Sequence, residues 1–215
     1  MMTICITIHA SPKEQEHFTK RGVEPEVFRG LNGVRLGLHP PRTFEQTRTG
    51  YPVAASAGCW LSHRALWAAC LLLPDDEFLI LEEDANFQRN WRKRFDTARA
   101  QLPSDWDVMF AGSCHADGKA SKHIAGDLFE FKQAVPAGHN GLLGGFAPCA
   151  AYGYPLCCHA VLIRRKALMP LIEAMDSREL SRSIDISLDT YGLENLRVFG
   201  VLPRIVDQWG HVLPA

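Results

Sequence analysis

The chain has 215 residues, of which 47% are hydrophobic and 22% charged, and its formal net charge is −1. This composition excludes an intrinsically disordered chain, and the near-zero charge excludes a general electrostatic attraction to nucleic acid or to an anionic membrane. The length suits one domain with a substantial core, so we expect a single domain over residues 1–215.

The amino-terminal segment predicts a strand, a helix and a second, shorter strand. Thr3–His9 is the first strand, and Ser11–Glu14 then supplies an N-cap, a first-turn proline and a capping-box glutamate for a helix. Val27–Gly30 is a short strand that leads into a Leu-Asn-Gly turn. The proline and glycine content of residues 37–52 predicts a loop, in which binding contacts could lie.

A long, mostly buried helix is predicted from Ala54 to Leu73, because apolar and small residues continue for several turns before a proline. Cys59 and His63 share one face of this helix. By itself, His63 fits either a core histidine that is satisfied by hydrogen bonds or a functional group.

The segment Phe78–Leu81 is a continuous apolar run, which predicts a central strand covered on both faces. Three acids follow it directly: Glu82, Glu83 and Asp84. Neighbouring carboxylates repel one another, so a divalent cation would stabilise them, and oxygen ligands favour magnesium or manganese over zinc. The alternative interpretation is a solvated loop end after a hydrophobic strand.

Downstream, an amphipathic helix is predicted over Asn90–Gln101, with a dense group of basic residues: Arg89, Arg92, Lys93, Arg94 and Arg99. These side chains form either a solvated face or a docking surface for a polyanion. Trp106–Gly112 is a buried strand, and loops with short strands follow. Five glycines in Gly138–Gly153 indicate either a mobile lid over a binding site or an irregular connection.

The carboxyl-terminal third predicts a strand at Leu156–Ile163, a helix at Arg164–Met175, a helix or turn at Ser183–Tyr191 and a strand at Leu196–Val201. The alternation of strands and helices along the whole chain favours a three-layer α/β sheet over a helix bundle or a β-sandwich.

The cysteines and the amino terminus indicate a cytoplasmic protein. Seven cysteines without paired spacing fit reduced thiols, and the Cys114–His115 and Cys157–His159 segments lack the paired cysteines of a structural zinc site. We see neither a signal peptide nor a transmembrane segment. The expected location is the cytoplasm, either free or peripheral at the inner membrane surface.

The segment Gly58–Trp67, GCWLSHRALW, followed by Phe78–Phe87, FLILEEDANF, resembles glycosyltransferase family 25. Weaker similarities lie at Leu31–Gly33, Leu102–Ser113, His159–Leu168 and Ser183–Leu188. The resemblance implies a GT-A type three-layer α/β/α sandwich with a mixed, mostly parallel sheet. It also implies transfer of a sugar from a nucleotide diphosphate to a hydroxyl group, with inversion and with Mn²⁺ or Mg²⁺.

The resemblance further implies a set of site residues. Glu82 and Asp84 would bind the metal, and His211 is a further candidate ligand by analogy with other GT-A enzymes. Ser62, His63 and Arg64 would brace the acidic strand end or the donor phosphates, and Asn32 and Glu83 are further candidates for the donor site. Arg64 suits the diphosphate, because a guanidinium binds two oxygens at once. Asn32 and Glu83 depart from the acids that the family commonly has at these positions.

For the base that removes the acceptor proton, the resemblance places Asp185 near the acceptor, and Asp189 lies one turn later as the reserve candidate. Asp185 also fits a structural role near the amino terminus of a helix, where the helix dipole favours an acid.

The function predicted is hexose transfer from UDP-galactose or UDP-glucose to a surface glycan or lipid-linked glycan. One alternative is a phage-type enzyme that glycosylates hydroxymethylated bases in DNA, which must be flipped out of the duplex. A second is a degenerate module that binds a sugar nucleotide without catalysis. The oligomeric state is not predicted.

Overall fold

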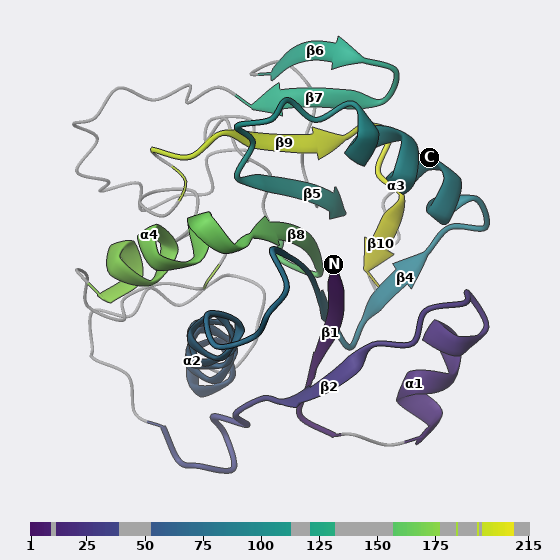
Figure 1. Cartoon of the computed structure of the whole chain (residues 1–215). Coiled ribbons are helices and arrows are strands. Elements are labelled where there is room, and N and C mark those ends of the chain that lie inside the picture. The colour runs from purple at the N-terminus through teal and green to yellow at the C-terminus, as the bar shows by residue number, and fades with distance from the viewer. Residues whose placement is uncertain are drawn as a thin grey trace, which may run out of the picture.

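A computed structural model describes residues 1–9, 12–38, 53–112, 121–131, 157–176, 184, 193 and 195–208. An eight-stranded sheet in the order β2-β1-β3-β8-β5-β9-β7-β6 forms its middle layer (Figure 1). Its strands are β1 (Met2–Thr7), β2 (Glu26–Arg29), β3 (Glu77–Glu82), β5 (Val108–Gly112), β6 (Ser121–Ala125), β7 (Leu128–Phe131), β8 (Ala160–Arg164) and β9 (Val198–Val201). A separate two-stranded sheet pairs β4 (Ala85–Phe87) with β10 (Val206–Gln208).

Helices cover both faces of the large sheet. Those described are α1 (Pro12–Thr19), α2 (Val53–Cys70), α3 (Trp91–Ala100) and α4 (Arg165–Asp176). α2 and α4 pack on one face, whereas α1, α3 and the small sheet pack on the other (Figure 1). The predicted three-layer α/β architecture is therefore confirmed.

The sheet is mixed, as predicted, but parallel pairings do not dominate it. Three of its pairings are parallel, β1 with β2, β1 with β3 and β5 with β9. Four are antiparallel, because β8 runs against both β3 and β5, and β7 runs against both β6 and β9. The prediction of a mostly parallel sheet is corrected to this extent.

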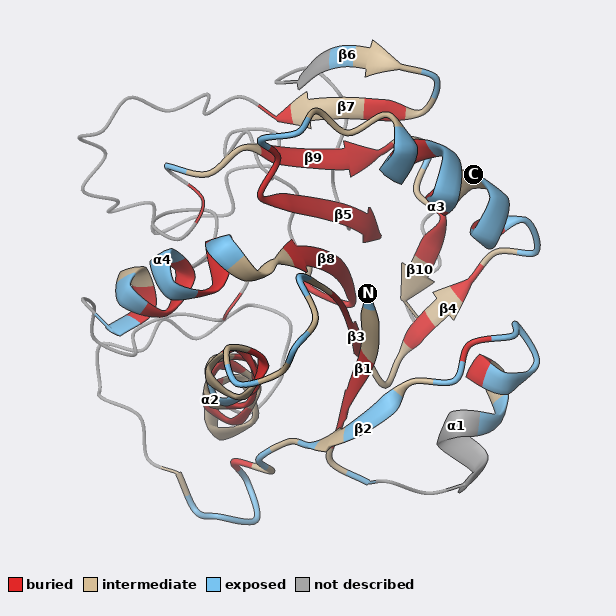
Figure 2. Cartoon of the chain, in the orientation of Figure 1, coloured by how far each residue is buried: buried red, intermediate tan, exposed pale blue. Residues whose placement is uncertain are grey.

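β3 is a central strand that is buried on both faces, as its continuous apolar sequence predicts (Figure 2). Phe78 and Ile80 face the α2 and α4 side, while Leu79 and Leu81 face the α3 side. All four side chains are at most 1% exposed. Burial of each contributes about 1.5–3 kcal/mol, which fixes the strand end that carries the acids.

The turn after β2 packs directly against the backbone of α2. A Cβ atom added to Gly33 would lie 1.7 Å from the carbonyl oxygen of Ala54, and one added to Gly58 would lie 2.4 Å from that of Leu31. Only glycine allows this approach, so the Leu-Asn-Gly turn and the first turns of α2 form one rigid unit.

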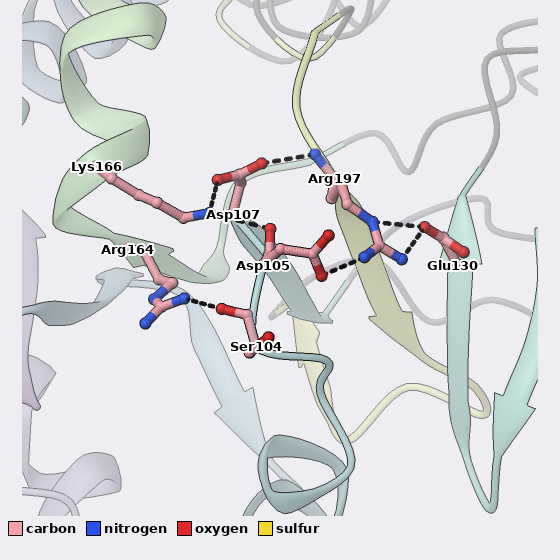
Figure 3. Close-up of polar contacts among 7 residues, drawn as sticks. All are labelled: Ser104, Asp105, Asp107, Glu130, Arg164, Lys166 and Arg197. Carbon is pink, nitrogen blue, oxygen red and sulfur yellow. Dashed lines mark hydrogen bonds and ion pairs between the residues drawn. The ribbon is translucent and has the colours of Figure 1, made fainter.

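An ion-pair network closes the end of the sheet opposite the acids (Figure 3). The guanidinium of Arg197 binds Glu130 at 2.6 Å and also pairs with Asp105. Asp107, at the start of β5, accepts from the backbone N–H of Arg197 at 2.8 Å and pairs with Lys166 at 2.8 Å. These contacts tie β5, β7, β9 and α4 together far from the strand end that carries the acids.

Several predictions from the sequence fall outside the described residues or need correction. The loop over residues 39–52 and the glycine-rich segment proposed as a lid lie outside the described ranges. Cys157 is disulfide-bonded, so the expectation of reduced thiols is wrong there, whereas Cys5, Cys59, Cys70 and Cys158 form no disulfide. Cysteine spacing alone does not reveal connectivity. Among the described helices, none is both long and apolar enough to cross a membrane.

Candidate functional site

The acid triplet, Glu82, Glu83 and Asp84, lies where β3 ends, beside the end of β1 and the small sheet. Although consecutive in the sequence, its carboxylates bind three different elements, α2, the end of β1, and β10. This arrangement relieves part of their mutual repulsion.

Glu82 points toward α2, on the same face of the sheet as Ile80. Its Oε1 accepts a hydrogen bond from Nε2 of His63 at 2.9 Å and from the thiol of Cys59 at 3.5 Å. His63 is 2% exposed, so the predicted functional histidine is also a buried and satisfied one. Burial raises the pKa of Glu82, but the hydrogen bond and attraction from His63 outweigh it and hold the net pKa below its usual range.

Glu83 fastens the triplet to β1. Its Oε2 accepts from the hydroxyl of Thr7 at 2.6 Å and from the backbone N–H of Ile8 at 3.1 Å. Thr7 is itself buried. The glutamate at this position therefore has a structural partner at the strand end.

Asp84 is the unsatisfied member of the triplet. Its Oδ2 accepts from the side-chain amide of Gln208 on β10 at 2.6 Å, whereas its buried Oδ1 has no hydrogen-bond partner among the described residues. Burial, and then the charge of Glu82, raise the pKa of Asp84 to about 6 against the effect of the Gln208 bond. A carboxylate with an unmet buried oxygen can bind a cation.

Ser62 and Asn32 hold the turn that precedes the site. The buried Ser62 donates from Oγ to the carbonyl of Gly58 at 2.6 Å and accepts from the backbone N–H of Leu31 at 2.8 Å. Asn32 caps its own turn, where its Oδ1 accepts from the N–H of Arg35 at 3.0 Å. In the structure, both residues position backbone rather than reach the acid triplet.

Arg64 does not lie with the acid triplet. Its guanidinium binds the carboxylate of Asp176, the last residue of α4, through two hydrogen bonds of 2.5 Å. Arg64 therefore links α2 to α4, on the same side of the sheet. Its expected contact with a diphosphate would require it to leave this pair.

Three predicted site residues are outside the described ranges: Asp185, Asp189 and His211. Their assignments as base, reserve base and metal ligand therefore remain predictions.

His159 is a buried residue that the sequence indicated only in the Cys157–His159 segment, considered for zinc, and at the start of a family-like segment. Its Nε2 donates to the carbonyl of Val206 on β10 at 3.1 Å, and its own carbonyl accepts from the N–H of Glu82 at 3.1 Å. Burial lowers its pKa, so the ring is neutral. The imidazole occupies the space beside Gly112, where an added Cβ would lie 2.2 Å from Nε2. It joins β3 to β10, a role that neither of these sequence patterns predicted.

The basic helix α3 uses several of its charges within the protein. Arg94 pairs with Asp127 and Arg99 with Glu77, both at 2.7 Å. The Arg92 guanidinium lies 4.1 Å from the centre of the Trp91 ring. These contacts support a structural role for this face of α3 over a docking surface.

Comparisons with known proteins give sequence matches. A family described as "Glycosyltransferase family 25 (LPS biosynthesis protein)" matches residues 13–132. A protein of Anopheles gambiae named "Glycosyltransferase 25 family member" is 26% identical over an alignment of 131 residues that covers 56% of this chain. The match spans only 22% of that relative's length.

Two solved structures resemble the fold more distantly. A197 from STIV has a TM-score of 0.46 at 11% identity, over 99% of this chain and 87% of its own. A glycosyltransferase involved in the glycosylation of the major capsid of PBCV-1 has a TM-score of 0.38 at 12% identity, over 82% of this chain and 66% of its own. Scores this low carry no weight for function.

Proposed function

The chain belongs to glycosyltransferase family 25, and from that premise we propose that it transfers a hexose from a nucleotide-diphosphate sugar to a hydroxyl group of a surface glycan. The proposed donor is UDP-galactose or UDP-glucose, and the proposed acceptor is a glycan or lipid-linked glycan. The family description, which names LPS biosynthesis, supports a glycan acceptor.

The observation that carries the proposal is the unmet oxygen of Asp84. A half-buried carboxylate, whose buried Oδ1 has no partner among the described residues, fits a divalent cation beside a second acid at the end of a central strand. The other metal ligands that we propose are Glu82 and His211. A bound Mn²⁺ or Mg²⁺ would neutralise charge on the diphosphate leaving group.

The remaining residues of the triplet and of α2 hold the donor site in shape. Glu83 fixes the strand end to β1, and His63 fixes the carboxylate of Glu82. Ser62 and Asn32 hold the Leu-Asn-Gly turn beside α2, and we propose that this turn contacts the donor. Arg64 is the proposed diphosphate ligand if the donor displaces Asp176.

For the chemical step, Asp185 is the proposed base and Asp189 the reserve. The base removes the proton of the acceptor hydroxyl as that oxygen attacks the anomeric carbon from the face opposite the nucleotide. The nucleotide diphosphate leaves with the electron pair of the broken bond. The transferred sugar is thereby inverted at the anomeric carbon.

The two alternatives have less support. The hypothesis of a DNA acceptor was supported by the basic residues of α3, but two of them, Arg94 and Arg99, are ion-paired within the protein. A degenerate binding module rested on Asn32 and Glu83, yet each has a defined structural contact, and the Asp84 oxygen remains available to a cation.

The test is incubation of the full chain with labelled UDP-galactose or UDP-glucose and Mn²⁺, with deacylated glycan or hydroxymethylated DNA as acceptor. We expect label on the glycan, loss of transfer in Asp84→Asn, and full transfer in the control Asp96→Asn, whose carboxylate is exposed on α3. Label on DNA instead of on the glycan would refute the proposal of a glycan acceptor. Absence of transfer and of donor hydrolysis, with donor binding retained, would favour the binding module.

A screen of nucleotide sugars by thermal shift, with and without Mn²⁺, identifies which of them bind as donor without requiring knowledge of the acceptor. A donor that binds only the native state, at a concentration 100 times its dissociation constant, raises the free energy of unfolding by about 2.7 kcal/mol. We expect the largest shift for a UDP-hexose, and only in the presence of the cation.

A further inference from the structure

A second set of ligand-type side chains, which shares Glu82 with the proposed Mn²⁺ or Mg²⁺ site, converges on the α2 side of the acid triplet. Cys59, His63 and Glu82 bring a thiol, an imidazole nitrogen and a carboxylate oxygen within 4.8 Å of one another. Among the described residues, this is the one group of three or more such side chains with that proximity.

The sequence produces this convergence through two regular elements. Cys59 and His63 are four residues apart on α2, so they lie on one face, one turn from each other. Glu82 is the last residue of β3 and faces α2. The ring of His63 packs edge-on against Trp67 with centroids 6.0 Å apart, which restricts its orientation.

Two of the three ligand-atom distances are close to those of a tetrahedral metal site, and the third, between Cys59 and His63, is at most 4.8 Å. Zinc binds sulfur at about 2.3 Å and nitrogen or oxygen at about 2.0–2.1 Å, so neighbouring ligand atoms lie about 3.3–3.6 Å apart. The Cys59 Sγ to Glu82 Oε1 distance is 3.5 Å. The His63 Nε2 to Glu82 Oε1 distance is 2.9 Å, so this pair must open by about half an ångström to admit an ion.

The chemical character of the ligand atoms determines which metal the site prefers. A thiolate and an imidazole favour zinc and similar transition metals, whereas the carboxylate of Asp84 favours magnesium or manganese. His63 is 2% exposed, but the Glu82 side chain is 20% exposed, which leaves a side from which an ion can enter.

We propose that Cys59, His63 and Glu82 form a three-ligand site for Zn²⁺ or a metal of similar chemistry, with the fourth position open to water. On binding, the metal replaces the thiol proton of Cys59, which is released to solvent. The Nε2 proton that His63 donated to Glu82 also leaves that nitrogen through solvent, so the neutral ring carries its proton on Nδ1 and offers the Nε2 lone pair. The ion ties α2 to β3, and its binding does not depend on sugar transfer.

The experiment uses the full chain with the metal alone. After exposure to zinc and dialysis, we expect stoichiometric zinc by mass spectrometry, and with Co²⁺ a thiolate-to-cobalt charge-transfer band in the near ultraviolet. Cys59→Ser should lose this band and bind zinc at least about tenfold more weakly. Two variants should keep both signals: Cys70→Ala, which removes another buried thiol of α2, and Asp84→Asn.

The wild-type protein decides the question even where a variant fails to fold. Absence of stoichiometric zinc and of the cobalt band in wild type overturns the site. So does retention of the band in Cys59→Ser, or its loss in folded Cys70→Ala or Asp84→Asn. A protein that binds zinc in this way but transfers no sugar supports this site and refutes the proposed function, so the two failures are distinguishable.

Discussion

Replacement of Asp84 by Asn should change how the stability of the protein depends on pH. The native pKa of Asp84 is raised from 3.8 to about 6 by burial and by the charge of Glu82. Below pH 3.8 the side chain is protonated in both the native and the unfolded states. Between the two values only the native state keeps the proton, so the free energy of unfolding falls as the pH rises, and the loss is complete above pH 6.

The size of this effect follows from the two pKa values. At about 1.36 kcal/mol per pH unit, the rise from 3.8 to about 6 corresponds to a loss of about 3 kcal/mol in wild type, treated as an upper value. Asn carries no titrating charge at this position. The stability of Asp84→Asn relative to wild type should therefore increase by up to about 3 kcal/mol between acidic and neutral pH.

The assay is urea denaturation of both proteins in chelator-treated buffer, followed by the fluorescence of the five tryptophans. Asp96→Asn serves as the exposed control, and its profile should follow that of wild type. Addition of Mn²⁺ at neutral pH should restore stability to wild type and not to Asp84→Asn. Parallel pH profiles for wild type and Asp84→Asn would refute the reasoning, because they would mean that Asp84 titrates alike in the folded and unfolded states.

Three further substitutions test other parts of the site. His63→Ala leaves the carboxylate of Glu82 without its main partner and should lower the free energy of unfolding by about 3 kcal/mol in urea denaturation; a loss below 1 kcal/mol would contradict the role of this pair. Gly33→Ala would place a Cβ over a carbonyl of α2, so it should lower the melting temperature more than Gly22→Ala does. At Gly22 only the positive φ is unfavourable, by about 1–2 kcal/mol. Equal shifts for the two variants would argue against the close backbone contact. Arg64→Ala breaks an exposed ion pair and should lower the free energy of unfolding by at most about 1 kcal/mol. A much larger loss of donor binding free energy in calorimetry would assign Arg64 to the diphosphate, whereas an unchanged affinity would remove it from the site.

The layered fold could be predicted from the sequence wherever local pattern decides the structure. The continuous apolar run of Phe78–Leu81 predicted a central strand, and β3 is buried on both faces. The long apolar segment before Pro74 predicted α2. The direction of β8 between β3 and β5 could not be predicted, because strand direction depends on long connections and on pairing between distant segments.

The site was only partly predictable for a related reason. The position of the three acids at a strand end followed from the sequence, but the directions of their side chains did not. Thr7 and Gln208, which bind Glu83 and Asp84, are far away along the chain and become neighbours only in the folded protein. Cys59 shares a helix face with His63 in the sequence pattern, yet without the position of Glu82 nothing indicated that this face could hold a metal.

The contacts of the acid triplet have a consequence for biosynthesis. Its partners come from the first strand, from a helix in the first third of the chain, and from Gln208 in the last described strand. A ribosome-bound nascent chain that still lacks β10 can pack β1, α2 and β3, but Asp84 then has no amide to bind. Ligand capture by this strand end therefore becomes complete only after residue 208 has left the ribosome, and a shortened product that ends before residue 206 would fold around an incomplete centre.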